Sequence, residues 1–539
     1  MEELFKDWLG AIAVLVYLLY PLLKRWLNRR KGAQRTSAPR KAPEARAPQR
    51  KPTAASRPEP PSPSPSPLSS GPATTPRVRG DDIVATAQVR ATRLREQATA
   101  LLRRAEADPR LIRLVPALRD DLLGRLTPID RSLASKPTVS TVMQDSAVIQ
   151  GLQQLLRYLD RMAEQRMRGA ASILGDADTM ADACYEPILE FARAQGLDLR
   201  TSTPVVVSGD WALSIVPRFA STRVAPLRLP RGFGRSLWLW PAIAHEIAHD
   251  LYYSVGGLEA DLHDRLGLPQ RLSAPRTERE IDPAWLRQLF GAWLSEVFAD
   301  TMGTLTLGPA YVETMRRAFR NPASAQRTSA IFASSGWIDE HPPPRLRLYM
   351  ATRVLHHLGR HAEADSLWEQ WEAEHADVNF YYLPLGGQWV GLSDESLHAL
   401  ADSIVDVLLE QSWPELADYR LMNIPGFAYL HGEHAEVERL RVALARGETV
   451  RGDVRWIMAA AVLAAVEQPT LHDQILEAAR LSIIGIGTEE RRTKAPKAAR
   501  PIRGAIGDIL VASLREPDAV REAIILGEAI RPYHQPRWR

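Results

Sequence analysis

The sequence has a single cysteine, Cys184, among its 539 residues. One cysteine excludes an intramolecular disulfide, and it leaves histidine and carboxylate side chains as the ligands of any zinc site within the chain. The sequence also lacks a large charge imbalance, since its formal net charge is only +4. Much of this basic excess lies before residue 80. Composition therefore gives no indication of nucleic-acid binding, and we expect no nucleic-acid partner.

Long apolar runs are scarce, although 45% of the residues are hydrophobic. This scarcity excludes a protein with many membrane spans. An uncharged apolar run at residues 8–23 is near the short end of what crosses a bilayer. An acidic flank precedes it and no small-residue cleavage site follows, so we expect an uncleaved membrane anchor. Six basic residues follow the run, which predicts a single-pass protein with its main part in the cytoplasm. An amphipathic surface helix or a core segment is the alternative.

The remaining composition divides the chain into regions. Residues 36–80 are rich in proline, alanine, serine and arginine, which predicts an extended linker. Apolar residues at helical spacing predict helices across residues 81–200. Four short β-like runs, bounded by glycine and proline, follow at 205–207, 212–217, 226–230 and 236–240. Helices resume at Pro241. We therefore expect a mainly α fold with a small β-sheet directly before one helix, and with helical flanking regions.

That helix carries the sequence His245-Glu246-Ile247-Ala248-His249, an H-E-x-x-H motif. Pro241 suits the first turn of a helix, and the glycine pair at 256–257 suits its end. Histidines four residues apart project from one face of a helix, as two imidazoles that bind one Zn²⁺ ion must. Glu246 lies between them and can act as a general base on a metal-bound water.

A zinc site needs a third protein ligand. The sequence predicts a second helix from Pro283 to about Thr304, with Asp282 as its N-cap. Glu296 and Asp300 stand at positions i and i+4 on this helix. Glu296 can complete a His-His-Glu ligand set, and Asp300 can accept a hydrogen bond from a ligand imidazole and fix its tautomer.

The H-E-x-x-H helix and the E-x-x-A-D segment from Glu296 to Asp300 together resemble the gluzincin metallopeptidases. The resemblance covers about residues 200–350, and it implies an α+β zincin-like catalytic domain with Zn²⁺ as cofactor and Glu296 as the third ligand. A metzincin is disfavoured because Tyr252 and Val255 stand where that family has a glycine and its third histidine.

Two further residues remain open as alternative third ligands. Glu259 and His263 both follow the motif helix closely enough for a loop to fold back on the metal.

A third segment, from His341 to Arg347, is similar to the H-P-P-x-x-x-R segment of membrane-associated gluzincins. These include the prenyl-protein endoproteases and bacterial quality-control peptidases. The resemblance implies that His341 or Arg347 contacts the site or its substrate; a turn before a helix, with a surface arginine, is the alternative. Tyr252 and Tyr253 are further candidates for oxyanion stabilisation, although aromatic residues on such a helix more often pack in the core.

Residues 351–539 contain no catalytic motif. The segment 358–375 resembles the segment 431–448, which favours helical hairpins of tetratricopeptide type as one interpretation and an ordinary helical domain as the other. Such hairpins could hold a protein partner.

These observations predict a membrane-anchored zinc endopeptidase that hydrolyses a peptide or protein substrate. Residues 1–35 would be the anchor with its basic flank, and residues 201–350 the cytoplasmic catalytic core. In the mechanism that we expect, zinc activates a water molecule and Glu246 carries its proton to the leaving amine. The alternative is an inactive membrane-tethered adaptor with a structural or vestigial zinc site. Glu246 favours the enzyme, because a structural zinc site has no use for a glutamate at that position.

The ligand assignment makes a direct prediction about metal content. We expect about one zinc ion per chain, measured by elemental analysis of the purified protein, because three ligands plus water form a catalytic site. The double variant His245→Ala, His249→Ala should lose the metal. Stoichiometric zinc in that variant would show that the assignment is wrong.

Overall fold

The structure is a computed structural model, and it describes residues 80–493 apart from short gaps. The gaps are residues 136, 169–170, 198, 200–203, 210–212, 218–221, 223, 274, 276, 321–327, 332, 335–336, 377–379 and 386–387. The chain divides into two units, Met1–Pro76 and Arg77–Arg539, and the described residues all belong to the second.

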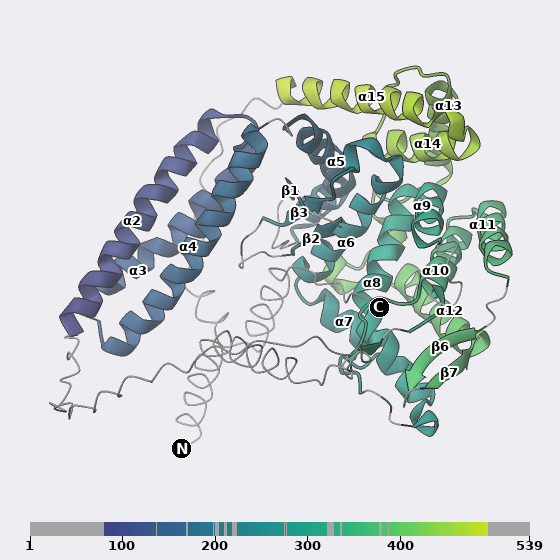
Figure 1. The fold of residues 1–539 in the computed structure, drawn as a ribbon, viewed down its shortest axis with the longest axis horizontal. Coiled ribbons are helices and arrows are strands. Elements are labelled where there is room, and N and C mark those ends of the chain that lie inside the picture. Colours follow the sequence, from purple (N-terminus) through teal and green to yellow (C-terminus); the bar gives the residue numbers. More distant parts are fainter. Residues whose placement is uncertain are drawn as a thin grey trace, which may run out of the picture. The chain divides into compact units, whose positions relative to one another are not determined.

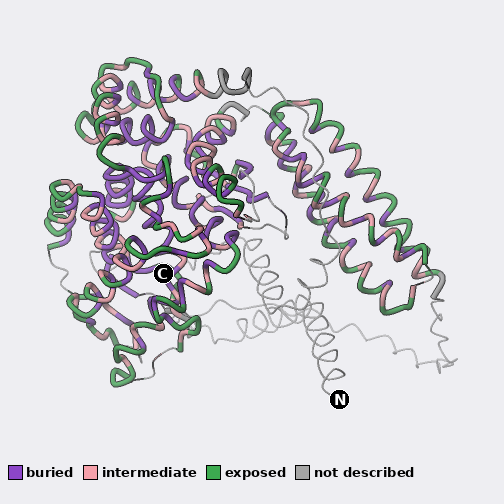
Figure 2. Tube along the Cα trace, turned by 180° about the vertical axis from the view of Figure 1, so that it is seen from behind, coloured by how far each residue is buried: buried purple, intermediate pink, exposed green. Residues whose placement is uncertain are grey.

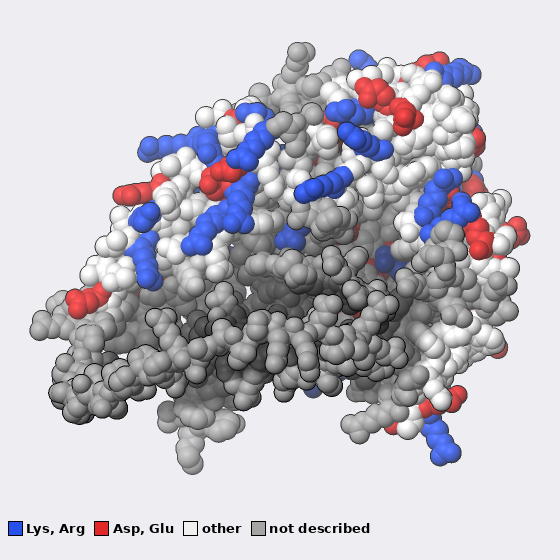
Figure 3. Space-filling view, in the orientation of Figure 1, with Lys and Arg blue, Asp and Glu red and all other residues white. Residues whose placement is uncertain are grey.

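A bundle of long helices begins this unit (Figure 1). Its elements are α2 (Gly80–Ala107), the 3-10 turn η1 (Ile112–Leu114), the π-helix η2 (Ala117–Leu123), α3 (Gly124–Ala134) and α4 (Val139–Met167). Alanine and leucine side chains at helical spacing form a buried cluster inside the bundle. Figure 3 shows many basic and a few acidic side chains over its surface. The ion pairs Arg95–Asp130 and Arg104–Asp160 join neighbouring helices of the bundle.

A three-stranded sheet follows the bundle and α5 (Ala171–Gln195). It contains β1 (Val205–Ser208), β2 (Ser214–Ile215) and β3 (Pro226–Leu229) in the order β1-β3-β2. Successive side chains of a strand point to opposite faces. Val205 and Val207 accordingly join the apolar cluster of the bundle, whereas Val206 joins a second and larger cluster. The sheet therefore separates two cores, and β2 lies at its edge, against α6 (Ala242–Ser254).

The second core gathers helices from the rest of the unit. After the turns η4 (Phe233–Arg235) and η5 (Leu237–Leu239) and helix α6, the order is α7 (Leu258–Arg265), η6 (Glu278–Glu280), α8 (Pro283–Leu307), α9 (Pro309–Phe319), β4 (Ala333–Ser334), β5 (Trp337–Ile338), α10 (Pro344–His357), α11 (His361–Glu374), β6 (Phe380–Leu385), β7 (Gln388–Ser393), α12 (Asp394–Glu410), η8 (Pro414–Leu416), η9 (Leu421–Asn423), α13 (His431–Ala445), α14 (Val454–Glu467), η10 (Pro469–Leu471) and α15 (His472–Thr493). One apolar cluster runs from Leu174 to Ile483 and so crosses residues 200 and 350, where the sequence analysis divided the chain.

Helix α8 passes through the middle of this core. The Asp282 carboxylate caps it by accepting a hydrogen bond from the backbone N–H of Trp285 at 2.7 Å, as the sequence predicts. From Val297 to Leu307 each of its residues is buried, and Figure 2 shows how densely buried segments gather in this part of the unit. Helix α6, which carries the H-E-x-x-H motif, packs along α8, whose second half is surrounded by other parts of the core.

The predicted fold class is confirmed, because the unit is mainly helical with a small sheet beside the motif helix. The strand predicted at 236–240 is wrong. That segment contains the 3-10 turn η5, in which the buried side chains of Leu237 and Trp240 lie three residues apart and thus on one side. The hairpin β6–β7 was not expected, although its Gly386-Gly387 sequence between two apolar runs is a typical hairpin signal.

The two similar segments of the C-terminal region both contain helices, but they occupy different places in their helix pairs. Helix α11 follows its partner α10, whereas α13 precedes its partner α14. The similarity of the segments therefore does not correspond to a repeated unit at these two places.

The predicted localisation needs correction. No helix within residues 80–493, as far as they are described, is long and apolar enough to cross a membrane. This finding overturns the prediction of a single-pass membrane protein with a cytoplasmic catalytic domain. The long helices α2 and α4 carry charged residues along their length, and α8 packs its apolar side chains in the protein core. The apolar run at residues 8–23 lies outside the described residues.

The packing of α8 makes a prediction about stability. A Cβ atom added at Gly291 would lie 2.1 Å from the carbonyl oxygen of Pro269, so Gly291→Ala must displace backbone. We expect it to lower the free energy of unfolding by about 1–3 kcal/mol. Gly151→Ala is a matched control, because Gly151 is an exposed helical glycine with open space around it, and it should raise stability by up to about 1 kcal/mol. Equal effects of the two substitutions in urea unfolding would contradict this packing.

Candidate metal centre

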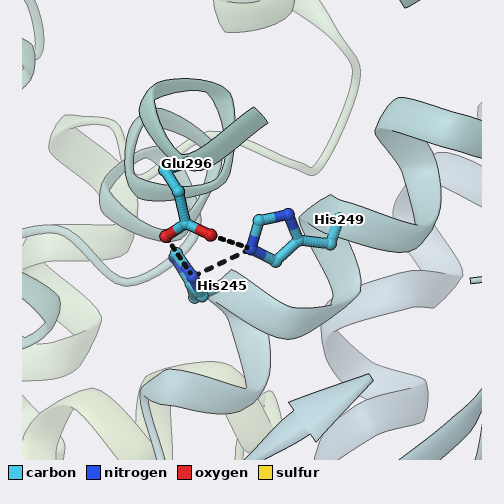
Figure 4. Close-up of side chains that lie close together, drawn as sticks. All are labelled: His245, His249 and Glu296. Carbon is cyan, nitrogen blue, oxygen red and sulfur yellow. Dashed lines mark hydrogen bonds and ion pairs between the residues drawn. The ribbon is translucent and has the colours of Figure 1, made fainter. Parts of the chain in front are cut away.

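Helices α6 and α8 bring the three predicted ligands together. His245 and His249 stand one turn apart on α6, and Glu296 faces them from α8 (Figure 4). The Nε2 atoms of the two histidines are 3.1 Å apart. The Glu296 oxygens lie 3.1 Å from Nε2 of His249 and 3.5 Å from Nε2 of His245. Within the described residues, these three make the one group of histidine, cysteine or acidic side chains that could hold a metal ion.

The spacing of these atoms fits a tetrahedral metal ion. Ligands at about 2.0–2.1 Å from such an ion lie about 3.4 Å from one another. The two Nε2 atoms are 3.1 Å apart, and they lie 3.1 and 3.5 Å from the two different oxygens of Glu296, so these separations are close to this value while no single carboxylate oxygen makes both. In addition, Oε2 of Glu296 is buried and accepts no hydrogen bond from the described part of the chain, and its nearest cationic neighbour is Nη2 of Arg347 at 3.3 Å. A buried carboxylate oxygen without such a bond is costly by itself, and a bound cation would satisfy it.

Asp300 lies one turn after Glu296 and contacts the imidazole of His245 at Nδ1, the nitrogen that does not face the cluster. Its Oδ1 is 2.9 Å from Nδ1 of His245. Arg347, on α10, donates two hydrogen bonds to the Asp300 carboxylate, at 2.7 and 2.8 Å, and its guanidinium is also 3.3 Å from Glu296. A hydrogen bond to Nδ1 leaves Nε2 as the nitrogen that can bind a metal.

The pKa values of these groups show how strongly they are coupled. Burial alone would lower the pKa of His245, but the Asp300 and Glu296 carboxylates outweigh burial and raise it to about 10. Burial alone would raise the pKa of Glu296, but His245, His249 and Arg347 hold it well below its usual range. Without a metal, the cluster therefore holds a proton on His245. A metal ion binds the neutral imidazole, so it must replace that proton.

Glu246 lies next to His245 on α6 but is not one of the three clustered ligands. Its Oε2 accepts a hydrogen bond of 2.7 Å from the backbone N–H of Ile215, on the edge strand β2. Glu246 and His249 are both only partly buried, so this side of the cluster is accessible to solvent.

The loop before α10 brings His341 close to the ligand Glu296. Nε2 of His341 lies 3.5 Å from Oε1 of Glu296, and about half of the side chain is exposed. Asp339 accepts hydrogen bonds from Nδ1 of His341 at 2.7 Å and from its backbone N–H at 2.9 Å. The Asp339 carboxylate raises the pKa of His341, in spite of burial. The sequence analysis did not identify Asp339 as a site residue.

The remaining predicted residues lie elsewhere. The Tyr252 ring packs against Phe298, and its hydroxyl is 3.5 Å from Nε2 of His263. Nδ1 of His263 lies 2.9 Å from the carbonyl oxygen of Leu268, and Tyr253 packs edge-on against Tyr252. Neither Glu259 nor His263, the alternative third ligands, belongs to the metal-ligand cluster of the described residues.

Tyr311 on α9, which was not expected from the sequence either, contacts both Asp300 and His245. Its hydroxyl donates to Oδ1 of Asp300 at 2.7 Å and lies 3.1 Å from Nδ1 of His245. The only sequence signal is indirect: Gly308-Pro309 ends α8 and starts α9, which turns the chain back toward Asp300. Nothing in that pattern marks a tyrosine as part of the site.

Comparison of the chain with protein-family models, with curated proteins and with solved structures found no match. A function for the site therefore has to be argued from its own residues and their geometry.

The buried ion pairs predict a specific pattern of stability. Arg347→Met leaves the Asp300 and Glu296 carboxylates buried without their guanidinium partner, so we expect a loss of about 3–5 kcal/mol in the metal-free protein. Adding Asp300→Asn should restore part of this loss, because it removes one uncompensated charge.

The control for this pair of variants is Arg353→Met, on the same helix. Arg353 forms a partly exposed ion pair with Asp402, so its loss should cost about 0–1 kcal/mol. Urea unfolding with a chelator present measures all three variants. If Asp300→Asn further destabilises Arg347→Met, the buried charges are not compensating one another.

Proposed function

We propose that the protein is a zinc-dependent endopeptidase that hydrolyses peptide bonds with a water molecule and forms no covalent intermediate. The observation that carries the proposal is the position of Glu246. Glu246 directly follows the ligand His245 on α6 without being one of the three clustered ligands, and the Ile215 backbone fixes its carboxylate through Oε2. A glutamate in this arrangement is what a general base requires and what a purely structural metal site does not.

The accessibility of the cluster supports catalysis. Structural zinc sites have four protein ligands and are closed, whereas catalytic sites have three and keep one position for water or substrate. The described residues supply three, of which His249 is partly exposed, and Glu246 and His341, which neighbour the ligands His245 and Glu296, are exposed in part as well. A substrate can therefore approach from this side.

Zinc suits this donor set, because it prefers imidazole and carboxylate ligands in tetrahedral geometry. His245, His249 and Glu296 would hold it. When bound, it would supply Lewis-acid polarisation of the scissile carbonyl and a lowered pKa for a water molecule.

The protein's own residues would then move the proton. Glu246 accepts it from the attacking water as the water oxygen bonds to the carbonyl carbon, and then donates it to the leaving nitrogen as the C–N bond breaks. The products are one carboxylate and one amine. Asp339 keeps His341 oriented and favours its protonated form, so His341 can donate a hydrogen bond to the oxyanion that develops during attack.

The edge strand offers a way to hold an extended substrate. The Ile215 N–H points away from β3 and toward Glu246, so the edge of β2 that no other described strand pairs with faces the general base. A peptide that paired with this edge would have its backbone beside Glu246. We therefore propose an extended or unfolded segment of a protein as the substrate class.

Two isosteric substitutions test the proposal. Glu246→Gln leaves the ligands in place and removes the base, so it should keep zinc and lose activity by a factor on the order of 100 or more. Glu296→Gln replaces a charged ligand with a weak neutral one and should lose both zinc and activity. Activity is measured by mass spectrometry of peptides released from a mixture of denatured proteins, under conditions where the wild type cleaves.

A third variant, Glu259→Gln, controls for general effects of removing a glutamate near α6 and should keep both properties. If Glu246→Gln holds zinc and cleaves as fast as the wild type, the hydrolytic mechanism is refuted. A wild type that holds zinc but cleaves nothing in this mixture would favour the adaptor alternative, with a structural or vestigial site.

A further inference from the structure

One face of α8 carries a residue of the metal centre on each of three successive turns. Glu296, Asp300 and Gly303 stand at positions i, i+4 and i+7, so they share one face of the helix. Glu296 faces the other two clustered ligands, and Asp300 contacts His245 at Nδ1, the ring nitrogen that does not face the cluster. Gly303 has no side chain, and the ring of Tyr311 lies over it.

The glycine leaves the space that this ring occupies. A Cβ atom at position 303 would lie 2.6 Å from Cε2, 2.7 Å from Cζ and 3.0 Å from Cδ2 of Tyr311. Real Cβ atoms essentially never approach so closely, so any other residue at position 303 would displace the ring. Because Cζ carries the hydroxyl, displacement of the ring also displaces that group.

The hydroxyl completes a triangle around Nδ1 of His245. It donates to Oδ1 of Asp300 at 2.7 Å, it lies 3.1 Å from Nδ1, and the same Oδ1 is 2.9 Å from Nδ1. The imidazole N–H is therefore directed between two oxygens, one from α8 and one from α9. Two acceptors restrict rotation of the imidazole ring more than one acceptor does, and rotation would move Nε2 out of the ligand cluster.

We propose that Tyr311 is a positioning residue of the metal centre, which orients His245 directly and through Asp300, and that Gly303 is required to admit it. The inference rests on the proposed metal site. In this scheme Tyr311 contacts neither the substrate nor any atom that binds the metal. Its contribution is to fix the direction in which Nε2 of His245 presents its lone pair.

The first test is Tyr311→Phe, which keeps the ring and removes the hydroxyl. Loss of an outer hydrogen bond to a metal ligand typically weakens metal binding about 10–100-fold, so we expect at least a 10-fold weaker zinc affinity, measured by competition with a chromophoric chelator. Cobalt(II) serves as a spectroscopic probe in the same site. Its visible absorption should change in position or intensity, because the His245 ring is less well oriented.

The matched control is Tyr185→Phe. Tyr185 is also buried and donates a 2.6 Å hydrogen bond to a buried aspartate, Asp250, on the motif helix α6. This variant removes the same chemical group from the same kind of partner without touching His245. It should bind zinc as tightly as the wild type and give the same cobalt spectrum, while the thermal unfolding midpoints of the two metal-free variants should be similar.

The second test is a double-mutant cycle with Gly303→Ala. If the glycine acts by admitting the hydroxyl, Gly303→Ala alone should weaken zinc binding, and adding it to Tyr311→Phe should weaken binding little further. If the double variant weakens zinc affinity by the product of the two single factors, the two residues act separately, and the role assigned to Gly303 is overturned. Should the alanine variant not fold, the comparison of Tyr311→Phe with Tyr185→Phe still decides the role of Tyr311.

The outcomes separate this inference from the proposed function. Wild type that binds no zinc refutes both. Wild type that binds zinc, together with Tyr311→Phe that binds it equally well and has the same cobalt spectrum, overturns the inference alone and leaves the proposed peptidase untouched.

Discussion

The contact between His245 on α6 and Asp300 on α8 is the interaction on which the metal centre depends. It orients the imidazole, and it does so inside a network of buried charges that also includes Glu296 and Arg347. Buried charges are stable only when each has a well-placed partner, since the cost of removing a charge from water exceeds what one imperfect contact returns. The network therefore stabilises one arrangement of the two helices and disfavours others.

The rest of the unit holds that arrangement in place. Helix α8 is buried along its second half and has a capped start, α9 returns Tyr311 to it, and α10 contributes Arg347. The edge strand β2 adds the one backbone N–H that fixes Glu246. Residues from five elements thus meet within a few ångströms, each held by its own packing. Such support is what keeps a catalytic constellation at its working geometry.

The two faces of the centre differ in a way that matches the proposed chemistry. Behind the ligands, the buried Asp300 carboxylate accepts hydrogen bonds from the buried Tyr311 and from Arg347, whose side chain is 11% exposed, so several contacts hold this side. In front, Glu246 and His341 are partly exposed and each is oriented by a single neighbouring group. Ligands supported by several hydrogen bonds on one side and partly exposed residues on the other suit a site that holds a metal and admits a substrate.

The sequence alone determined what depends on local spacing. Positions i and i+4 on a helix fixed that His245 and His249 share a face, and the N-cap Asp282 fixed where α8 begins, whereas Glu296 was named as the third ligand from its place in the E-x-x-A-D segment. At residues 236–240 the local pattern was insufficient, because a short apolar run fits a strand or a helical turn. The membrane anchor was inferred from hydropathy alone, and none of the described helices is long and apolar enough to span a membrane. Only the tertiary structure decided the roles of Tyr311 and of the Ile215 N–H. Their contacts join separate elements, and the packing that brings such elements together leaves no periodic trace in the sequence of either one.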